Sequence, residues 1–176
     1  GRLDAEGDVD SQYVGDDLRY AAAPLSRYGP WAHMEGASYW RPCVAPGWRP
    51  YWNGRWYYTP AGNTWVSYDP WGWVPHHYGS WDYFPTYGWV WQPGYRWAPA
   101  WVYWYQGPSY TGWGPTGYYT HYYGPRWGFG FGFHFGVYGW AGGDWGHFNH
   151  WTFVPSHYWH GYHHGYRDGH HGGWHD

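Results

Sequence analysis

The chain has 176 residues, a formal net charge of −3 with neutral histidines, and an aromatic content of 29% that includes 21 Trp and 23 Tyr. It contains no Ile and no Lys and has Leu only at positions 3, 18 and 25, which excludes an aliphatic core, so any core must be built from rings. No basic cluster and no run of about 18 apolar residues occur, so we expect neither nucleic-acid binding nor a transmembrane segment.

The same composition predicts the fold class. Gly (30) and Pro (15) are dense and good helix formers are scarce, whereas aromatic side chains favour the pleated surface of a sheet. We therefore predict an all-β fold, an antiparallel meander of about three 25-residue Trp-rich repeats, with Gly/aromatic strands and extended terminal segments.

The first 25 residues predict an acidic N-terminal arm. Half of the twelve acidic residues lie within the first 17 positions, which hold no Trp. Such a segment could add a strand to the sheet edge of a neighbouring copy. The sequence starts at Gly1 rather than Met, and we expect that a signal was removed or that the chain was trimmed. The abundance of Trp, Tyr and Gly together with the lack of Lys predicts a secreted or cell-surface protein.

Residues 26–115 predict a Trp-rich β-repeat domain. Three series of Trp recur at spacings of 24 to 26 residues: Trp31, Trp56 and Trp81, then Trp40, Trp65 and Trp91, then Trp48, Trp73 and Trp97. In the second unit we expect strands over 55–59, 64–68 and 71–74, separated by turns that contain Pro, Gly and Asn. A fourth, truncated unit ends near Pro115. These nine Trp are predicted to be structural core, with an exposed aromatic platform for sugar rings as the alternative.

The repeat region resembles a family of bacterial secreted tryptophan-rich proteins of unknown function over about residues 25–115. The matching segments are WVS at 65–67, PWGW at 70–73, HYGSW at 77–81, GWVW at 88–91 and WAPAWV at 97–102, and residues 151–155 resemble a late segment of such proteins. The resemblance implies an exported, envelope or extracellular protein and supplies no catalytic residues. The acidic start and the Gly/His-rich end depart from the family pattern.

Groups with chemical reactivity are few in the repeat region. Its acids after the first unit are Asp69 and Asp82, both in turn-like contexts, and no Gly-x-Ser-x-Gly or His-Glu-x-x-His motif occurs. We therefore predict that the protein is not an enzyme. Cys43 is the single cysteine, and we expect it to be a buried small apolar residue, with an intermolecular link as the alternative.

Residues 116–140 predict a Gly/aromatic strand region. Phe129, Phe131, Phe133 and Phe135 alternate with Gly or His, so an extended chain would place all four rings on one face. The opposite face would be nearly bare backbone, which allows another strand or a stack of rings to approach closely. We interpret this segment as an assembly strand.

Residues 141–176 predict a His/Gly-rich C-terminal segment. Its candidate metal ligands are His157, His160, His163, His164, His170 and His171. Neutral imidazole binds Zn, Cu or Ni, but the spacing matches no defined site, so we expect at most a weak metal site and no other cofactor. A polar tail is the competing interpretation.

The leading functional hypothesis is a non-enzymatic, secreted structural protein, a homo-oligomeric or homopolymeric subunit of an extracellular fibre or surface assembly. The argument is that a thin meander cannot bury every ring, and exposed rings and sheet edges favour assembly through aromatic packing and strand exchange. The first alternative is a cell-envelope module that binds polysaccharide or peptidoglycan. The second alternative is a His-rich metal-binding protein.

Overall fold

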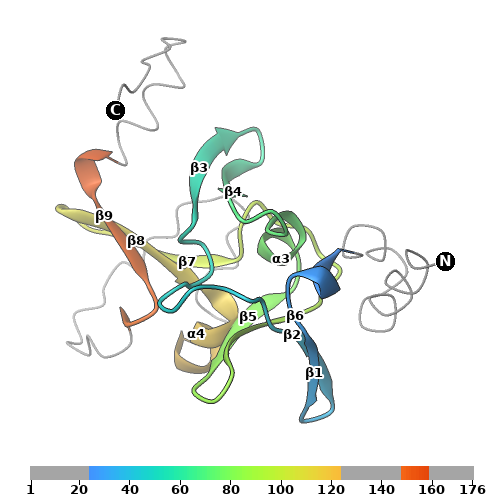
Figure 1. The fold of residues 1–176 in the computed structure, drawn as a ribbon. Helices are drawn as coiled ribbons and strands as arrows, with labels where there is room; N and C mark the ends of the chain where they lie inside the picture. The colour runs from blue at the N-terminus through green and yellow to red at the C-terminus, as the bar shows by residue number, and fades with distance from the viewer. Residues whose placement is uncertain (1–23, 124–147, 159–176) are drawn as a thin grey trace.

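The computed structural model describes residues 24–123 and 148–158, and within them the chain is built mainly of antiparallel strands (Figure 1). The all-β class is therefore confirmed. The strands are β1 (Trp31–Met34), β2 (Ala37–Trp40), β3 (Gly54–Thr59), β4 (Gly62–Ser67), β5 (Ser80–Phe84), β6 (Gly88–Gln92), β7 (Val102–Gln106), β8 (Tyr110–Pro115) and β9 (Thr152–Pro155). A short 3-10 turn, η1 (Leu25–Arg27), precedes β1 and buries Leu25 in the core.

The strands form three separate sheets. Sheet A has the order β1-β2-β6-β5, sheet B consists of β3 and β4, and sheet C has the order β7-β8-β9. The first eight strands pair as four consecutive hairpins, but β2 also pairs with β6, so the chain does not run as one continuous meander. In Figure 1 hairpin β3–β4 lies at the top, sheet A below it and sheet C to the left, with the core between them.

Each of the four hairpins carries one directly opposed pair of Trp. These pairs are Trp31 with Trp40, Trp56 with Trp65, Trp81 with Trp91, and Trp104 with Trp113. Because directly opposed residues of antiparallel strands share one face, each pair directs two indoles to the same side of its hairpin. Trp40 also opposes Trp91, so a row of four Trp crosses sheet A, one from each strand.

Indole rings make up the largest part of the core. The buried Trp of the described residues are Trp40, Trp48, Trp56, Trp65, Trp71, Trp81, Trp89, Trp91, Trp104, Trp113 and Trp151. Their ring pairs are mostly tilted or edge-to-face, for example Trp40 and Trp71 at 4.9 Å and 71°. Three sheets surround this interior, yet Trp52, Trp73, Trp97 and several Tyr stay exposed, so the described residues do not bury every ring, as expected.

Several of the buried indole N–H groups donate to backbone carbonyls that lie outside the strands. Trp81 donates to Pro75 O at 2.8 Å and Trp91 to Tyr78 O at 2.8 Å. Trp40 donates to Leu25 O at 2.9 Å. A buried carbonyl without a partner is costly, and a Phe at the same position would offer no donor. The need for Trp rather than Phe in this core follows from these bonds.

The strand expected over 71–74 is wrong, since helix α3 (Trp73–His77) occupies this part of the chain. A turn begins it, with Gly72 N donating to Asp69 O at 2.9 Å, and the helical bonds follow, including Tyr78 N to Val74 O at 2.9 Å. The helix directs Val74, His76 and His77 inward. Tertiary packing of these side chains decides against the strand that aromatic content favours.

The strand region expected from residue 116 is also wrong at its start, because α4 (Thr116–Tyr123) is a helix. It packs on β5, where Gly117 approaches so closely that a side chain there would clash with the carbonyl oxygen of Trp81. Tyr119 on the same helix is fully buried. Glycine allows this close contact between helix and strand. The four Phe of the predicted assembly strand lie outside the described residues.

β9 joins sheet C from far along the chain. It pairs antiparallel with β8, with Thr111 opposite Val154 and Gly112 opposite Phe153. Trp151, just before the strand, is buried against Tyr119. Within the described ranges, no helix has the length and apolar character that crossing a membrane requires.

Candidate binding surface

Three Trp side chains of the described residues are clearly exposed. Trp52 has an exposed fraction of 50%, Trp73 of 55% and Trp97 of 38%. Large apolar side chains at the surface are informative when they are grouped, since grouped exposed rings mark binding surfaces. Trp73 and Trp97 are grouped, because both contact the same buried residue, His77.

His77 lies between the two exposed indoles at the end of α3. Its ring centroid is 4.0 Å from that of Trp73, with the planes tilted by 44°, and 5.6 Å from that of Trp97, with the planes nearly parallel at 9°. His77 itself is only 1% exposed. We call Trp73, His77 and Trp97 the indole platform.

Hydrogen bonds hold the base of the indole platform in place. His77 Nδ1 donates to Ala98 O at 2.8 Å, and Ala98 N donates back to His77 O at 2.9 Å. The same carbonyl of His77 accepts a bond from Trp101 Nε1 at 2.9 Å. These bonds join α3 to the segment between β6 and β7, so the two exposed indoles belong to one rigid unit.

The charge state of His77 is set mainly by its burial. Removal from water disfavours imidazolium and lowers the pKa of His77, and the carbonyls of Ala98 and Trp65 only partly oppose this effect. The ring is therefore neutral at neutral pH. A platform of two indoles over a neutral imidazole suits apolar or C–H-rich ligand faces rather than anions.

The preceding residue, His76, lies in the centre of the core and not beneath exposed rings. It is 1% exposed and its ring is surrounded by aromatic rings, with Tyr51 at 4.9 Å, Trp81 at 5.7 Å and Trp71 stacked at 6.0 Å. Its Nδ1 lies 2.7 Å from Gly72 O. Burial lowers the pKa of His76 to about 3, so it is neutral and enclosed, and no ligand reaches it.

Tyr51 is a core residue that the sequence did not reveal. Its backbone has φ 59°, its side chain is 1% exposed, and its hydroxyl donates to His76 O at 2.8 Å while accepting from Trp101 N at 3.1 Å. Its carbonyl accepts from Trp113 Nε1 at 2.6 Å. Tyr51 thus connects α3, β8 and the segment before β7. It lies in an irregular loop, so no periodicity marks it.

The acid Asp69 has a structural position. Its Oδ1 accepts from Asn53 Nδ2 at 2.9 Å, and its Oδ2 accepts from Trp48 Nε1 at 3.2 Å and from Ser67 Oγ at 3.3 Å. Asp82 accepts the N–H of Tyr83 at 2.8 Å. Both carboxylates thus accept hydrogen bonds from groups of the fold, and Asp69 organises the turn that leads into α3.

The nine Trp of the predicted repeat core have three kinds of position. Trp40, Trp48, Trp56, Trp65, Trp81 and Trp91 are buried, Trp31 is half-buried on edge strand β1, and Trp73 and Trp97 are exposed. The third series therefore divides, although its members share one position in the repeat pattern. The structure brings Trp73 and Trp97 together and keeps Trp48 in the core, where it packs on Trp71 and Trp81.

Of the predicted metal ligands, only His157 belongs to the described residues. It is exposed and its ring lies 4.3 Å from that of Tyr158. No group of three or more His, Cys, Asp or Glu side chains suited to a metal ion occurs within 24–123 and 148–158. The other five histidines of that prediction lie outside these ranges, so the weak metal site stays a prediction.

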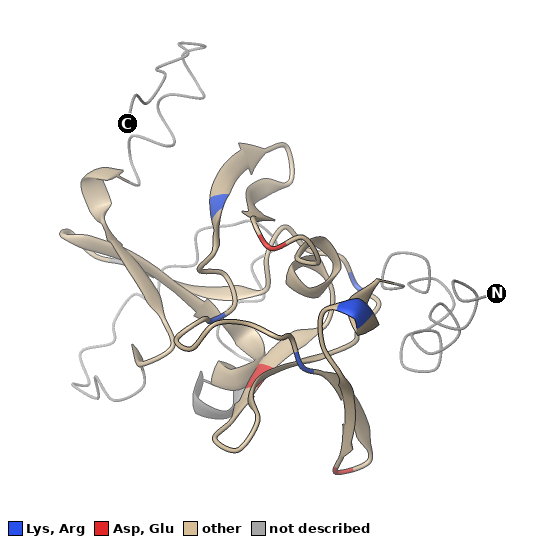
Figure 2. Ribbon diagram, in the orientation of Figure 1, with Lys and Arg blue, Asp and Glu red and all other residues tan. Residues whose placement is uncertain are grey.

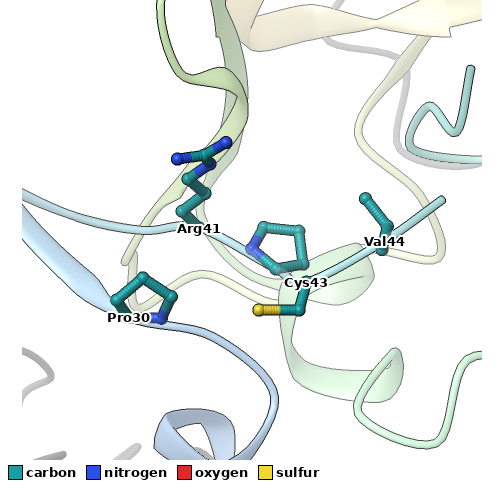
Figure 3. A pocket seen from close by; sticks show the side chains of 5 residues that line it. Pro30, Arg41, Cys43 and Val44 are labelled. Atoms are coloured by element: carbon teal, nitrogen blue, oxygen red, sulfur yellow. The ribbon is translucent and has the colours of Figure 1, made fainter. Parts of the chain in front are cut away.

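Cys43 is exposed, which corrects the expectation of a buried residue. It follows Arg41 and Pro42 in the loop after β2, where Cys43 N donates to Tyr28 O at 2.7 Å, so the backbone is fixed while the thiol faces outward. The thiol lines a surface hollow of about 570 Å³ with Pro30, Arg41 and Val44 (Figure 3).

Comparison with known proteins assigns the chain to a family without a known function. Residues 22–120 match the model of a family described as "Family of unknown function (DUF6600)". No curated protein and no solved structure matches the chain. The matched range contains all four hairpins, α3 and the indole platform, and it spans more than half of the 176 residues. The protein therefore belongs to this family of unknown function.

Proposed function

We propose that the protein is a non-enzymatic, secreted or cell-surface module that binds envelope polysaccharide through the indole platform. The observation that carries this proposal is the pair of exposed indoles, Trp73 and Trp97, packed on buried His77. Most other indoles of the described residues are buried, with Trp52 as a further exposed one. Two large rings kept at the surface on a rigid base are typical of a binding site rather than of a core.

The chemistry of a sugar ring fits this platform. One face of a pyranose ring presents C–H groups that carry partial positive charge, and the face of an indole is the negative end of its quadrupole. Stacking therefore gains both apolar burial and electrostatic attraction. Hydrogen bonds fix His77, and the indoles of Trp73 and Trp97 pack on its ring, so binding orders few additional side chains.

The binding test uses the full chain and the double variant Trp73→Ala/Trp97→Ala. Purified peptidoglycan and a panel of soluble neutral polysaccharides are titrated while intrinsic Trp fluorescence and sedimentation with insoluble polymer are followed. We expect saturable binding by the wild type and at least a tenfold loss in the double variant, since stacking contacts of this kind contribute roughly 1 kcal/mol or more each.

The matched control is Tyr87→Ala, which removes another exposed ring (42% exposed) from the turn between β5 and β6. This control should bind as the wild type does. Wild-type protein that binds no member of the panel, or a double variant that binds as well as the wild type, would contradict the proposal.

A second candidate function is self-association by strand exchange, as in the fibre hypothesis. The observation that favours it is β9, which completes sheet C although 28 residues separate it from the end of α4 (positions 124–151). A β9 strand from another copy could pair with β8 in the same register. Sheet edges also remain at β1, β5 and β7, and such edges invite further strands.

Electron microscopy and light scattering at neutral pH, with and without chelator, test this second candidate. Regular fibres or a discrete oligomer in both conditions would support strand exchange. Fibres that vanish with chelator would favour assembly through the histidine-rich segment instead. Monodisperse monomers in both conditions would rule out the fibre hypothesis and leave polysaccharide binding.

A further inference from the structure

The third exposed indole, that of Trp52, lies close to Arg49 in the loop between β2 and β3. The guanidinium carbon of Arg49 is 5.6 Å from the ring centroid of Trp52. Arg49 Nε donates to Thr152 Oγ1 at 3.0 Å, across 103 positions of the sequence. The loop and β9 together therefore fix the orientation of the guanidinium, while its two terminal nitrogens make no bond to Thr152.

Arg49 has no carboxylate partner among the described residues. The described acids are Glu35, Asp69 and Asp82, and Figure 2 shows how sparse the charged positions are on the ribbon. Burial lowers the pKa of the Arg49 guanidinium, which shows that part of its hydration is lost. A partly desolvated cation without a counter-ion is unfavourable, so an anion supplied from outside would be stabilised there.

The surroundings of Arg49 are also cationic or neutral. Burial, together with the charge of Arg49, lowers the pKa of His150, whose ring packs on Tyr83 at 4.6 Å and Trp89 at 4.9 Å. The backbone N–H of His150 donates to Tyr119 Oη at 3.0 Å. The phenol of Tyr119 also acts on the Arg49 guanidinium and partly opposes the effect of burial on its pKa, but no carboxylate of the described residues pairs with it.

We propose that Arg49 and Trp52 form a subsite for a carboxylate-bearing sugar unit of an acidic polysaccharide. The terminal guanidinium nitrogens donate to the two carboxylate oxygens in a paired geometry, and the exposed indole covers the face of the same sugar ring. This inference rests on the proposed polysaccharide binding, and it specifies the chemical class of the polymer.

A single sugar carboxylate fits this subsite better than a nucleic acid does. The described residues hold five arginines, at positions 27, 41, 49, 55 and 96, and Figure 2 shows them scattered along the ribbon, whereas a phosphate backbone is bound by clustered cations. An acidic polysaccharide needs only one cation for each recognised unit. An exposed ring with a guanidinium over one of its faces matches a unit that has both a C–H face and a carboxylate.

The test compares polygalacturonate with its methyl ester, which has the same backbone without the charge. Full-length wild type, Arg49→Gln and Trp52→Ala are titrated with both polymers by calorimetry. We expect Arg49→Gln to bind polygalacturonate about tenfold more weakly, because a charge-assisted pair is lost, and to bind the ester as the wild type does. Trp52→Ala, which removes an exposed ring, should weaken the binding of both polymers.

The matched control is Arg41→Gln, which removes an exposed arginine from the separate hollow around Cys43 (Figure 3). It should bind both polymers as the wild type does. An equal loss in Arg41→Gln would indicate attraction by net charge alone and would overturn the subsite. Unchanged polygalacturonate binding in Arg49→Gln would overturn it as well.

Two further outcomes separate this subsite from the indole platform. If Trp97→Ala abolishes the binding of both polymers while Arg49→Gln leaves both unchanged, the platform stands and the subsite fails. If the binding of polygalacturonate requires Arg49 but not Trp97, the subsite stands and the platform fails. The acidic segment at positions 1–25 is a competing occupant. A variant with amides in place of the carboxylates of Asp4, Glu6 and Asp8 tests this. If it binds polygalacturonate more strongly, and if adding Arg49→Gln to it then has no effect, the subsite is contradicted.

Discussion

His76 and His77 are neighbours on α3, and both lie among Trp rings, yet they belong to opposite environments. The rings around His76, among them Tyr51, Trp71 and Trp81, are themselves buried. The rings on His77, Trp73 and Trp97, face solvent. One short helix thus contributes to the centre of the core and to the base of the candidate binding surface.

This comparison shows that residue type does not separate stability from binding in a protein so rich in Trp. A Trp–His contact occurs in both places, and only the exposure of the indole distinguishes them. Rings enclosed on all sides lose their water and stabilise the fold. Rings with one covered face keep the other for a ligand. The four predictions below test this division.

Trp81→Ala should have the largest effect on stability. Trp81 is 1% exposed, packs on Trp40, Trp48 and His76, and donates to Pro75 O. Its removal leaves a cavity and an unpaired carbonyl, so we expect a loss of about 3–5 kcal/mol in the free energy of unfolding. Urea titration followed by circular dichroism measures it. A loss below about 1 kcal/mol would show that the interior is loosely packed.

Acid should weaken the core through His76. The pKa of His76 is about 3 in the folded chain and near 6.5 when unfolded, so the unfolded state binds the proton more readily between these values. Stability is complete above pH 6.5 and falls as the pH drops toward 3, by about 1.4 kcal/mol per pH unit for this residue. Urea titrations at pH 7, 5.5 and 4.5 measure the slope.

His76→Asn should flatten that slope, whereas His157→Asn, which changes an exposed histidine, should leave it unchanged. Stability that is constant from pH 7 to 4.5 in the wild type would contradict the buried position of His76. His77 contributes in the same direction, because burial also lowers its pKa.

Tyr51→Phe should have an intermediate effect. The change removes one hydroxyl, which leaves His76 O without its donor and Trp101 N without its acceptor. We expect a loss of about 1–3 kcal/mol, because both groups are buried or half-buried. Tyr68→Phe, at a side chain with 61% exposure, is the matched control and should change stability by less than about 0.5 kcal/mol. Equal effects of the two changes would refute the bridging role of Tyr51.

Trp73→Ala should have the smallest effect on stability, within about 0.5–1 kcal/mol, because its indole is already more than half exposed. The same variant should nevertheless weaken polysaccharide binding. Thermal unfolding and sedimentation with insoluble polymer, measured on one preparation, compare the two properties. A large loss of stability would place Trp73 with the core and not with the surface.

The sequence predicted the hairpins better than it predicted their assembly. The first two Trp series mark residues that oppose each other across the hairpins, because a constant spacing of Trp and turn residues is a local property of each hairpin. The third Trp series did not reveal that Trp48 is buried while Trp73 and Trp97 are exposed. Its members follow the strands in loops and in α3, where neighbours from other parts of the chain decide exposure.

The sequence by itself determined the fold class and the composition of the core: an all-β chain with an aromatic core, few charges, and turns where Gly and Pro recur. Only the tertiary structure decided which rings are enclosed. It placed β2 beside β6, turned residues 73–77 into a helix, and brought Arg49 to Thr152 across 103 positions. These are long-range contacts, and in a chain with so many similar rings the local pattern does not distinguish one packing partner from another.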